Sequence, residues 1–140
     1  NYEPPAANFP SAPTNYVTDS ANVINETIEA QMNEDLKAFD AKAQIAVVTV
    51  ETTEPETIEQ YTIDLAEKWG PGYKDKDNGI IFLVAVKDRK MRIEVSRGLE
   101  GDLTDSEAGR IIDSVKPAFR ESKYAEGIKT GIEGIKKEVQ

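Results

Sequence analysis

The spacing of hydrophobic residues changes several times along the chain, and each change marks a predicted element. Apolar side chains recur every three or four positions over residues 23–39, which predicts an amphipathic helix with Asn25 as its possible N-cap. The β-branched run Gln44–Val50 predicts a buried strand, and Pro55 favours the first turn of a second helix. The apolar face of that helix consists of Ile58, Tyr61, Leu65 and Trp69.

The middle of the chain predicts a β-hairpin. After a Gly-rich loop at 70–79, residues 80–86 are continuously apolar, which is typical of a buried strand. The polar residues 87–90 form a predicted turn, and apolar and charged side chains then alternate over 91–95 as in a half-exposed strand.

The last third of the chain predicts two helices. Thr104 and Glu107 have the spacing of a capping box, in which each side chain satisfies an otherwise unpaired backbone N–H group. The helix that begins there is expected to end or kink at Pro117. The inner face of this helix is Ala108, Ile111, Ile112 and Val115, and that of the final helix is Ile128, Ile132, Ile135 and Val139.

This order of elements predicts one α/β domain with a mixed parallel and antiparallel sheet. The first crossover should be parallel and right-handed, whereas the hairpin is antiparallel. A chain of 140 residues with 39% hydrophobic content can bury one core. We therefore place the domain at residues 16–140. The Pro-rich stretch 1–15 is predicted to be a linker, which either remains after removal of a signal peptide or only marks where the sequence was cut.

Composition narrows the possible functions. Acidic residues outnumber basic ones by 26 to 17, and the net charge of −9 argues against nucleic acid or an anionic membrane surface as the main partner and favours a cation. The absence of Cys and His excludes disulfides, thiolate nucleophiles, Cys/His zinc sites and imidazole bases. No segment approaches the roughly 18 apolar residues of a membrane span, so we expect a soluble piece. We also expect the isolated domain to be a monomer.

Two acidic loops are expected to meet at one edge of the sheet, because one loop precedes the first hairpin strand and the other follows the second. Their side chains are Asp75, Asp77, Asn78, Glu100, Asp102 and Asp105. Such gathered oxygen ligands suit Ca²⁺ or Mg²⁺. Simpler explanations also exist, since Asp77-Asn78-Gly79 is ordinary turn chemistry and Asp105 favours a helix N-terminus.

Better-defined motifs are missing. An EF-hand counted from Asp75 would have Ile80 and Val86 at the positions that require Gly and Glu. The sequence has no phosphate-binding P-loop, no dinucleotide fingerprint and no nucleophile elbow, so nucleotide binding and serine hydrolysis lack support.

Several separated motifs resemble the TPM-domain family of thylakoid phosphatases, photosystem-repair proteins and acetylcholine-receptor auxiliary proteins. The central ones are Trp69-Gly70 with Asp77-Asn78-Gly79-Ile80-Ile81, and Gly98-Leu99-Glu100-Gly101 with Leu103-Thr104-Asp105. Val17-Thr18-Asp19 resembles the entry motif, Asp88-Arg89-Lys90 the hairpin, and Tyr124-Ala125-Glu126-Gly127-Ile128 a C-terminal motif. Ser96 and Arg97 depart from the family, which usually has Gly and an aromatic residue there. Arg97 could contact a phosphate, and we prefer the interpretation that it neutralises Glu100.

The resemblance implies an α/β/α sandwich with a sheet of about four strands, export from the cytoplasm and a membrane anchor outside the domain. By position, the implied metal ligands are Asp77, Asn78, Asp102, Asp105 and, less firmly, Asp19.

Two functions from different classes follow from the residues and the resemblance. The first is a binding or assembly module of a membrane-protein complex that binds Ca²⁺ or Mg²⁺ at the acidic edge, and we favour it because a fold does not confer a reaction. The alternative is a metal-assisted acid phosphatase acting on a phosphorylated small substrate, with Asp77 and Asp105 as catalytic residues.

Overall fold

The computed structural model describes residues 9–11 and 13–140 and contains a four-stranded mixed sheet. The strands are β1 (Val17–Asp19), β2 (Gln44–Val50), β3 (Gly79–Ala85) and β4 (Lys90–Val95), in the order β1-β2-β3-β4. β1, β2 and β3 are parallel, and β4 is antiparallel to β3. The predicted mixed sheet of about four strands is therefore confirmed.

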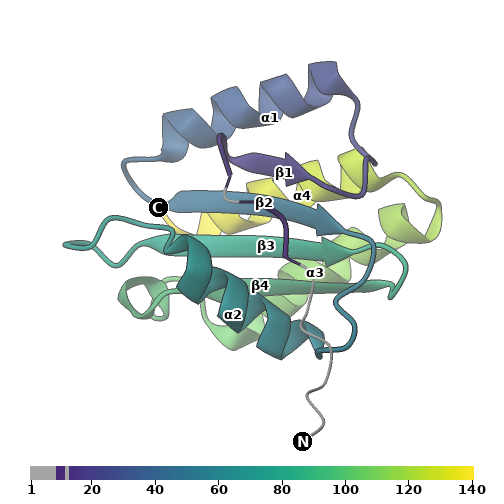
Figure 1. Cartoon of the computed structure of the whole chain (residues 1–140). Coiled ribbons are helices and arrows are strands. Elements are labelled where there is room, and N and C mark those ends of the chain that lie inside the picture. The colour runs from purple at the N-terminus through teal and green to yellow at the C-terminus, as the bar shows by residue number, and fades with distance from the viewer. Residues whose placement is uncertain (1–8, 12) are drawn as a thin grey trace, which may run out of the picture.

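Helices cover both faces of this sheet (Figure 1). They are α1 (Glu26–Phe39), α2 (Ile58–Trp69), α3 (Asp105–Arg120) and α4 (Tyr124–Glu138), with a short 3-10 helix η1 (Arg97–Leu99). α2 packs alone on one face, while α1, α3 and α4 share the other. The α/β/α prediction is thus confirmed.

β3 lies in the centre of the core, and all seven of its residues are buried. Phe82 and Val84 face α1, α3 and α4, whereas Ile81 and Leu83 face α2. This explains why the sequence of β3 is continuously apolar instead of alternating, because helices bury both of its faces.

Three details differ from the sequence-based prediction. The hydrophobic pattern did not reveal β1, since three residues are too few to show a strand periodicity. α2 begins at Ile58 and not near Pro55, because the Thr57 side chain accepts a hydrogen bond from the backbone N–H of Gln60 at 3.2 Å and caps the helix there. Pro117 does not end α3, which continues to Arg120.

The predicted caps of α1 and α3 are confirmed. The Asn25 side chain accepts from the N–H of Ile28 at 2.8 Å, and Thr104 and Glu107 form the expected capping box. Of the predicted linker 1–15, residues 1–8 and 12 lie outside the described residues, and Phe9 stacks on Tyr61 of α2 with 4.7 Å between ring centroids. None of the described helices is both long enough and apolar enough to cross a membrane.

Candidate functional site

The loops 70–78 and 96–104 meet where β2 and β3 begin and β4 ends, which we call the amino edge. The Gly98 N–H donates to the carboxylate Oδ2 of Asp77 at 3.0 Å. The Ser96 hydroxyl donates to the backbone carbonyl of Asp77 and accepts from the N–H of Gly79 at 3.0 Å. The expected meeting of the two loops is therefore confirmed, and Asp77 and Ser96 hold them together.

The backbones of the two loops are in direct contact at Gly98. A Cβ atom added there would lie 2.3 Å from the carbonyl oxygen of Asp77 and 2.6 Å from that of Lys76. Asp77 has a positive φ of 49°, a conformation that Asp tolerates better than most residues. The contact requires glycine at position 98, which accounts for the Gly in that motif.

Asn78 is buried and supports the 70–78 loop from inside. Its Oδ1 accepts from the N–H of Tyr73 at 2.8 Å, and its Nδ2 donates to the carbonyl of Lys42 at 3.1 Å. Both ends of the side chain are thus used within the protein, as expected for a buried amide. Asn78 holds the loop to the turn between α1 and β2, and both polar ends of its side chain are occupied.

A second network at the same edge centres on Asp40, directly after α1. Its carboxylate accepts from the hydroxyls of Tyr16, at 2.8 Å, and Tyr73, and from Nε2 of Gln44 at 3.1 Å. Burial alone would raise the pKa of Asp40, but the hydrogen bonds from Tyr73, Tyr16 and Gln44, with the nearby charge of Lys76, outweigh it and lower the pKa. Burial and the bond to Asp40 raise the pKa of Tyr16 to about 12.

The remaining acidic residues of the amino edge point into solvent. Asp105 is the first residue of α3, next to the Thr104 cap, where a carboxylate favours the helix N-terminus. Asp105 and Glu100 line a hollow beside β4, whereas Asp77 lines a different hollow beside α2. Asp102 is exposed and lines neither hollow. Within the described ranges Arg97 forms no salt bridge, so our prediction that it neutralises Glu100 is wrong.

These side chains do not form a ready-made cation site. Across residues 9–11 and 13–140, no three carboxylates lie close enough together to hold a metal ion. Asn78 is committed to internal hydrogen bonds, and one oxygen of Asp77 is bonded to Gly98. The fit to Ca²⁺ or Mg²⁺, which need several oxygen ligands at once, is therefore poor.

Asp19 lies at the opposite end of the sheet, where β1 ends. Its carboxylate accepts from the N–H groups of Val23 at 3.1 Å and Ile24 at 2.8 Å, and from the hydroxyl of Thr49 at 2.6 Å. The structure therefore brings Asp77, Asn78, Asp102 and Asp105 to one edge but leaves Asp19 at the other, where it holds the connection from β1 to α1.

Sequence reasoning missed the residues that position the loops. Asp40, Tyr16 and Tyr73 come from three separate segments, and no motif links them. Ser96 was noticed only as a departure from a family pattern, although its hydroxyl joins the two loops. A polar residue just after α1 and a Tyr in a Gly-rich loop give too little local signal to predict such a network.

These features define an α/β/α domain in which two hydrogen-bonded loops form one end of a mixed sheet. The family model of the TPM domain matches residues 17–138, and the chain belongs to the TPM-domain family. No match was found among curated proteins.

Solved structures show the same fold. The N-terminal domain of a P. gingivalis protein is 34% identical, with a TM-score of 0.80, and the match covers 89% of this chain and 82% of that one. The N-terminal domain of the Corynebacterium glutamicum protein cg2496 is 18% identical (TM-score 0.71; 96% and 86% covered). The BA42 protein of Bizionia argentinensis is 17% identical (TM-score 0.71; 83% and 81% covered). The last two likenesses concern the fold alone.

Proposed function

We propose that this TPM domain is a non-catalytic binding or assembly module of a membrane-associated complex outside the cytoplasm. The observation that carries the proposal is the joining of the two amino-edge loops. Asp77 and Asn78 use their side chains to hold these loops, which favours a preformed docking surface over a set of reactive groups. The exposed carboxylates of this surface are Asp75, Asp77, Glu100, Asp102 and Asp105. The membrane and the extracytoplasmic setting rest on the family resemblance.

A cationic partner suits this surface best. The chain carries a net charge of −9, and exposed carboxylates steer positively charged groups towards them. We keep Ca²⁺ or Mg²⁺ as the small ligand proposed for the same carboxylates, with weak binding, because the loops would have to rearrange before three oxygen ligands could reach one ion.

A titration with Ca²⁺ and Mg²⁺ tests whether the amino-edge carboxylates bind a divalent cation weakly. We expect gradual ¹H–¹⁵N shifts confined to residues 73–78 and 97–105. The Kd should be about 1 mM or weaker, which is the weakest affinity in the range for extracellular calcium modules. Asp102→Asn should weaken the effect, whereas Asp113→Asn, on an exposed part of α3, serves as the control. A Kd of about 10 μM or tighter would mean that these residues form a strong site, against our interpretation.

The alternative is a metal-assisted acid phosphatase with Asp77 and Asp105 as the catalytic pair. A general base must lie within hydrogen-bonding reach of the attacking water, in the same hollow as the phosphoryl group. Asp77 and Asp105 line separate hollows, and Asp77 is already bonded to Gly98. The geometry therefore favours the binding module.

A further inference from the structure

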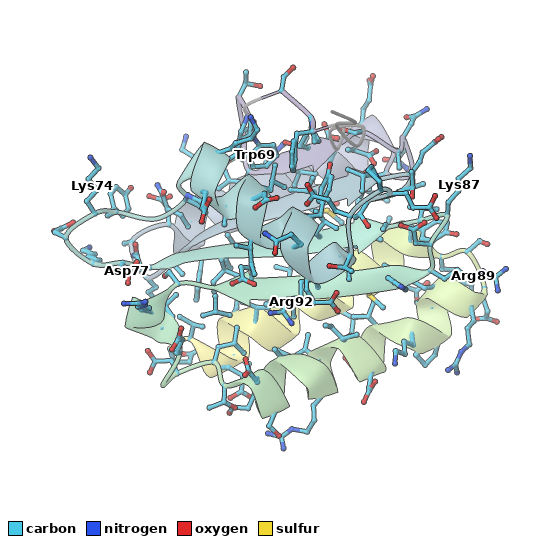
Figure 2. The ribbon with its side chains drawn as sticks, turned by 60° about the horizontal axis from the view of Figure 1, so that its bottom comes forward. Trp69, Lys74, Asp77, Lys87, Arg89 and Arg92 are labelled. Atoms are coloured by element: carbon cyan, nitrogen blue, oxygen red, sulfur yellow. The ribbon has the colours of Figure 1, made fainter. Side chains whose placement is uncertain are left out.

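A cavity of about 220 Å³ lies at the end of the sheet opposite the amino edge. It lies between the turn that joins β3 to β4 and the turn that joins α3 to α4. Figure 2 shows Arg89, one of its lining residues, and Asp77 at opposite ends of the sheet. The cavity is therefore separate from the loops discussed above.

The lining of this cavity is basic although the protein is acidic. Arg89, Lys90, Lys116 and Arg120 contribute to it, and none of its lining residues is a carboxylate. Lys116 pairs with Asp113 at 3.0 Å. Among the described residues, Arg89 and Arg120 form no salt bridge and no side-chain hydrogen bond, so both guanidinium groups keep their donors available. We call this feature the basic cavity.

The charge at the end of α3 explains the positions of only two of the four basic residues in the cavity. Lys116 and Arg120 lie in the last part of α3, where cations offset the partial negative charge of a helix C-terminus. Arg89 and Lys90 come from the hairpin turn and are not explained in this way. Asp113 pairs with Lys116, and Asp88 lies near Lys90. Arg89 and Arg120 are therefore the groups whose mutual repulsion a bound anion would reduce most.

Apolar and aromatic side chains also line the cavity. Phe119 and Tyr124 pack edge to face with 5.3 Å between ring centroids, and Met91 lies on the sheet side. Cavities of this kind bury the apolar part of a small ligand and fix its orientation with a few polar groups.

We propose that the basic cavity binds a phosphate monoester attached to a small apolar or aromatic group. A phosphate monoester carries up to two negative charges, and guanidinium groups such as those of Arg89 and Arg120 bind its oxygens in pairs. The place also fits a general rule, because ligands of open α/β sheets bind outside the carboxyl ends of the parallel strands, and the cavity lies at the end of β3. This site does not depend on the function proposed for the amino edge.

Titration of the whole chain with phenyl phosphate tests the proposal, with phenol as the uncharged analogue. We expect saturable ¹H–¹⁵N shifts at residues 84–91 and 116–124 with phenyl phosphate and none with phenol. The double substitution Arg89→Gln/Arg120→Gln should weaken binding by about tenfold or more, since it removes two charged hydrogen-bonding groups. Both side chains are exposed, so the variant should fold.

The matched control is Arg110→Gln/Lys137→Gln, which changes the net charge by the same amount at exposed residues outside the cavity. It should alter the Kd by less than about twofold. Three results would each overturn the proposal: no saturable shifts, equal weakening by both double variants, or equally tight binding of phenol.

Vesicles distinguish the two sources of such a phosphate. If phosphatidic acid vesicles, but not phosphatidylcholine vesicles, bind the protein and the Arg89→Gln/Arg120→Gln variant loses this binding, the ligand is a lipid headgroup. If only phenyl phosphate binds, the ligand is a soluble phosphate monoester. Each of these outcomes supports the basic cavity as the site.

Discussion

Replacing Gly98 by Ala should destabilise the domain by about 2 kcal/mol, a typical cost of inserting an atom into a packed position. The new Cβ would lie 2.3 Å from the carbonyl oxygen of Asp77 and 2.6 Å from that of Lys76, so the two amino-edge loops would have to separate. Both neighbours are backbone atoms and cannot move aside as a flexible side chain can. Urea unfolding measured by circular dichroism gives the difference directly.

Gly101→Ala is the matched control for this experiment. Gly101 lies in the same loop, and a Cβ added there meets nothing within 4 Å. Its stability should therefore change by less than about 0.5 kcal/mol. If the two variants were equally stable, the loops would not be in the close contact that we describe.

Asp40→Asn should cost about 2 kcal/mol at pH 7, because it removes the charged acceptor of three hydrogen bonds from Tyr16, Tyr73 and Gln44. The pKa of Asp40 is lowered in the folded protein. Its contribution to stability is therefore complete above the unfolded-state pKa of about 3.9 and decreases as the pH falls through the lower folded-state value. The difference between wild type and variant should accordingly shrink below about pH 4.

Unfolding of both proteins between pH 2.5 and 7 measures this dependence. Asp113→Asn is the control, because Asp113 is 71% exposed and its pairing with Lys116 at 3.0 Å should contribute less than about 0.5 kcal/mol. A difference between wild type and Asp40→Asn that stays constant down to pH 2.5 would show that the charge of Asp40 does not stabilise the fold.

Most of the fold was predictable from the sequence because its elements are long and clearly patterned. β2 has the predicted bounds, and β3 and β4 begin within one residue of the prediction. The helix caps at Asn25 and Thr104 could be predicted from the sequence because each involves residues only three positions apart. Two features were predicted incorrectly because their sequence signals are short or conflicting. β1 has only three residues, and the packing of α3 overrides the tendency of Pro117 to end a helix.

The candidate site was predictable only as a meeting of loops. Topology alone indicated that the loops before β3 and after β4 share an edge. It could not indicate that Asp77 would bond to Gly98 or that Asn78 would be buried, because hydrogen-bond partners depend on side-chain orientation. The basic cavity was missed for a related reason. Arg89 and Lys90 were interpreted only as part of a hairpin turn, and nothing in the sequence linked them to Arg120 on another element.

The two proposed binding regions lie at opposite ends of the sheet. Exposed carboxylates gather at the amino edge, and the basic cavity lies at the other end, although the net charge is −9. Under our two proposals, a cationic partner binds at one end and a small anion at the other, as an assembly role would use.

Turnover of p-nitrophenyl phosphate in the presence of saturating Ca²⁺ or Mg²⁺ tests the central claim, that the amino edge binds without catalysing, most directly. The wild-type protein, Asp105→Asn and the control Asp113→Asn should all give rates equal to the background with metal alone. Metal-dependent turnover that is lost in Asp105→Asn and kept in Asp113→Asn would contradict the claim and establish the phosphatase alternative.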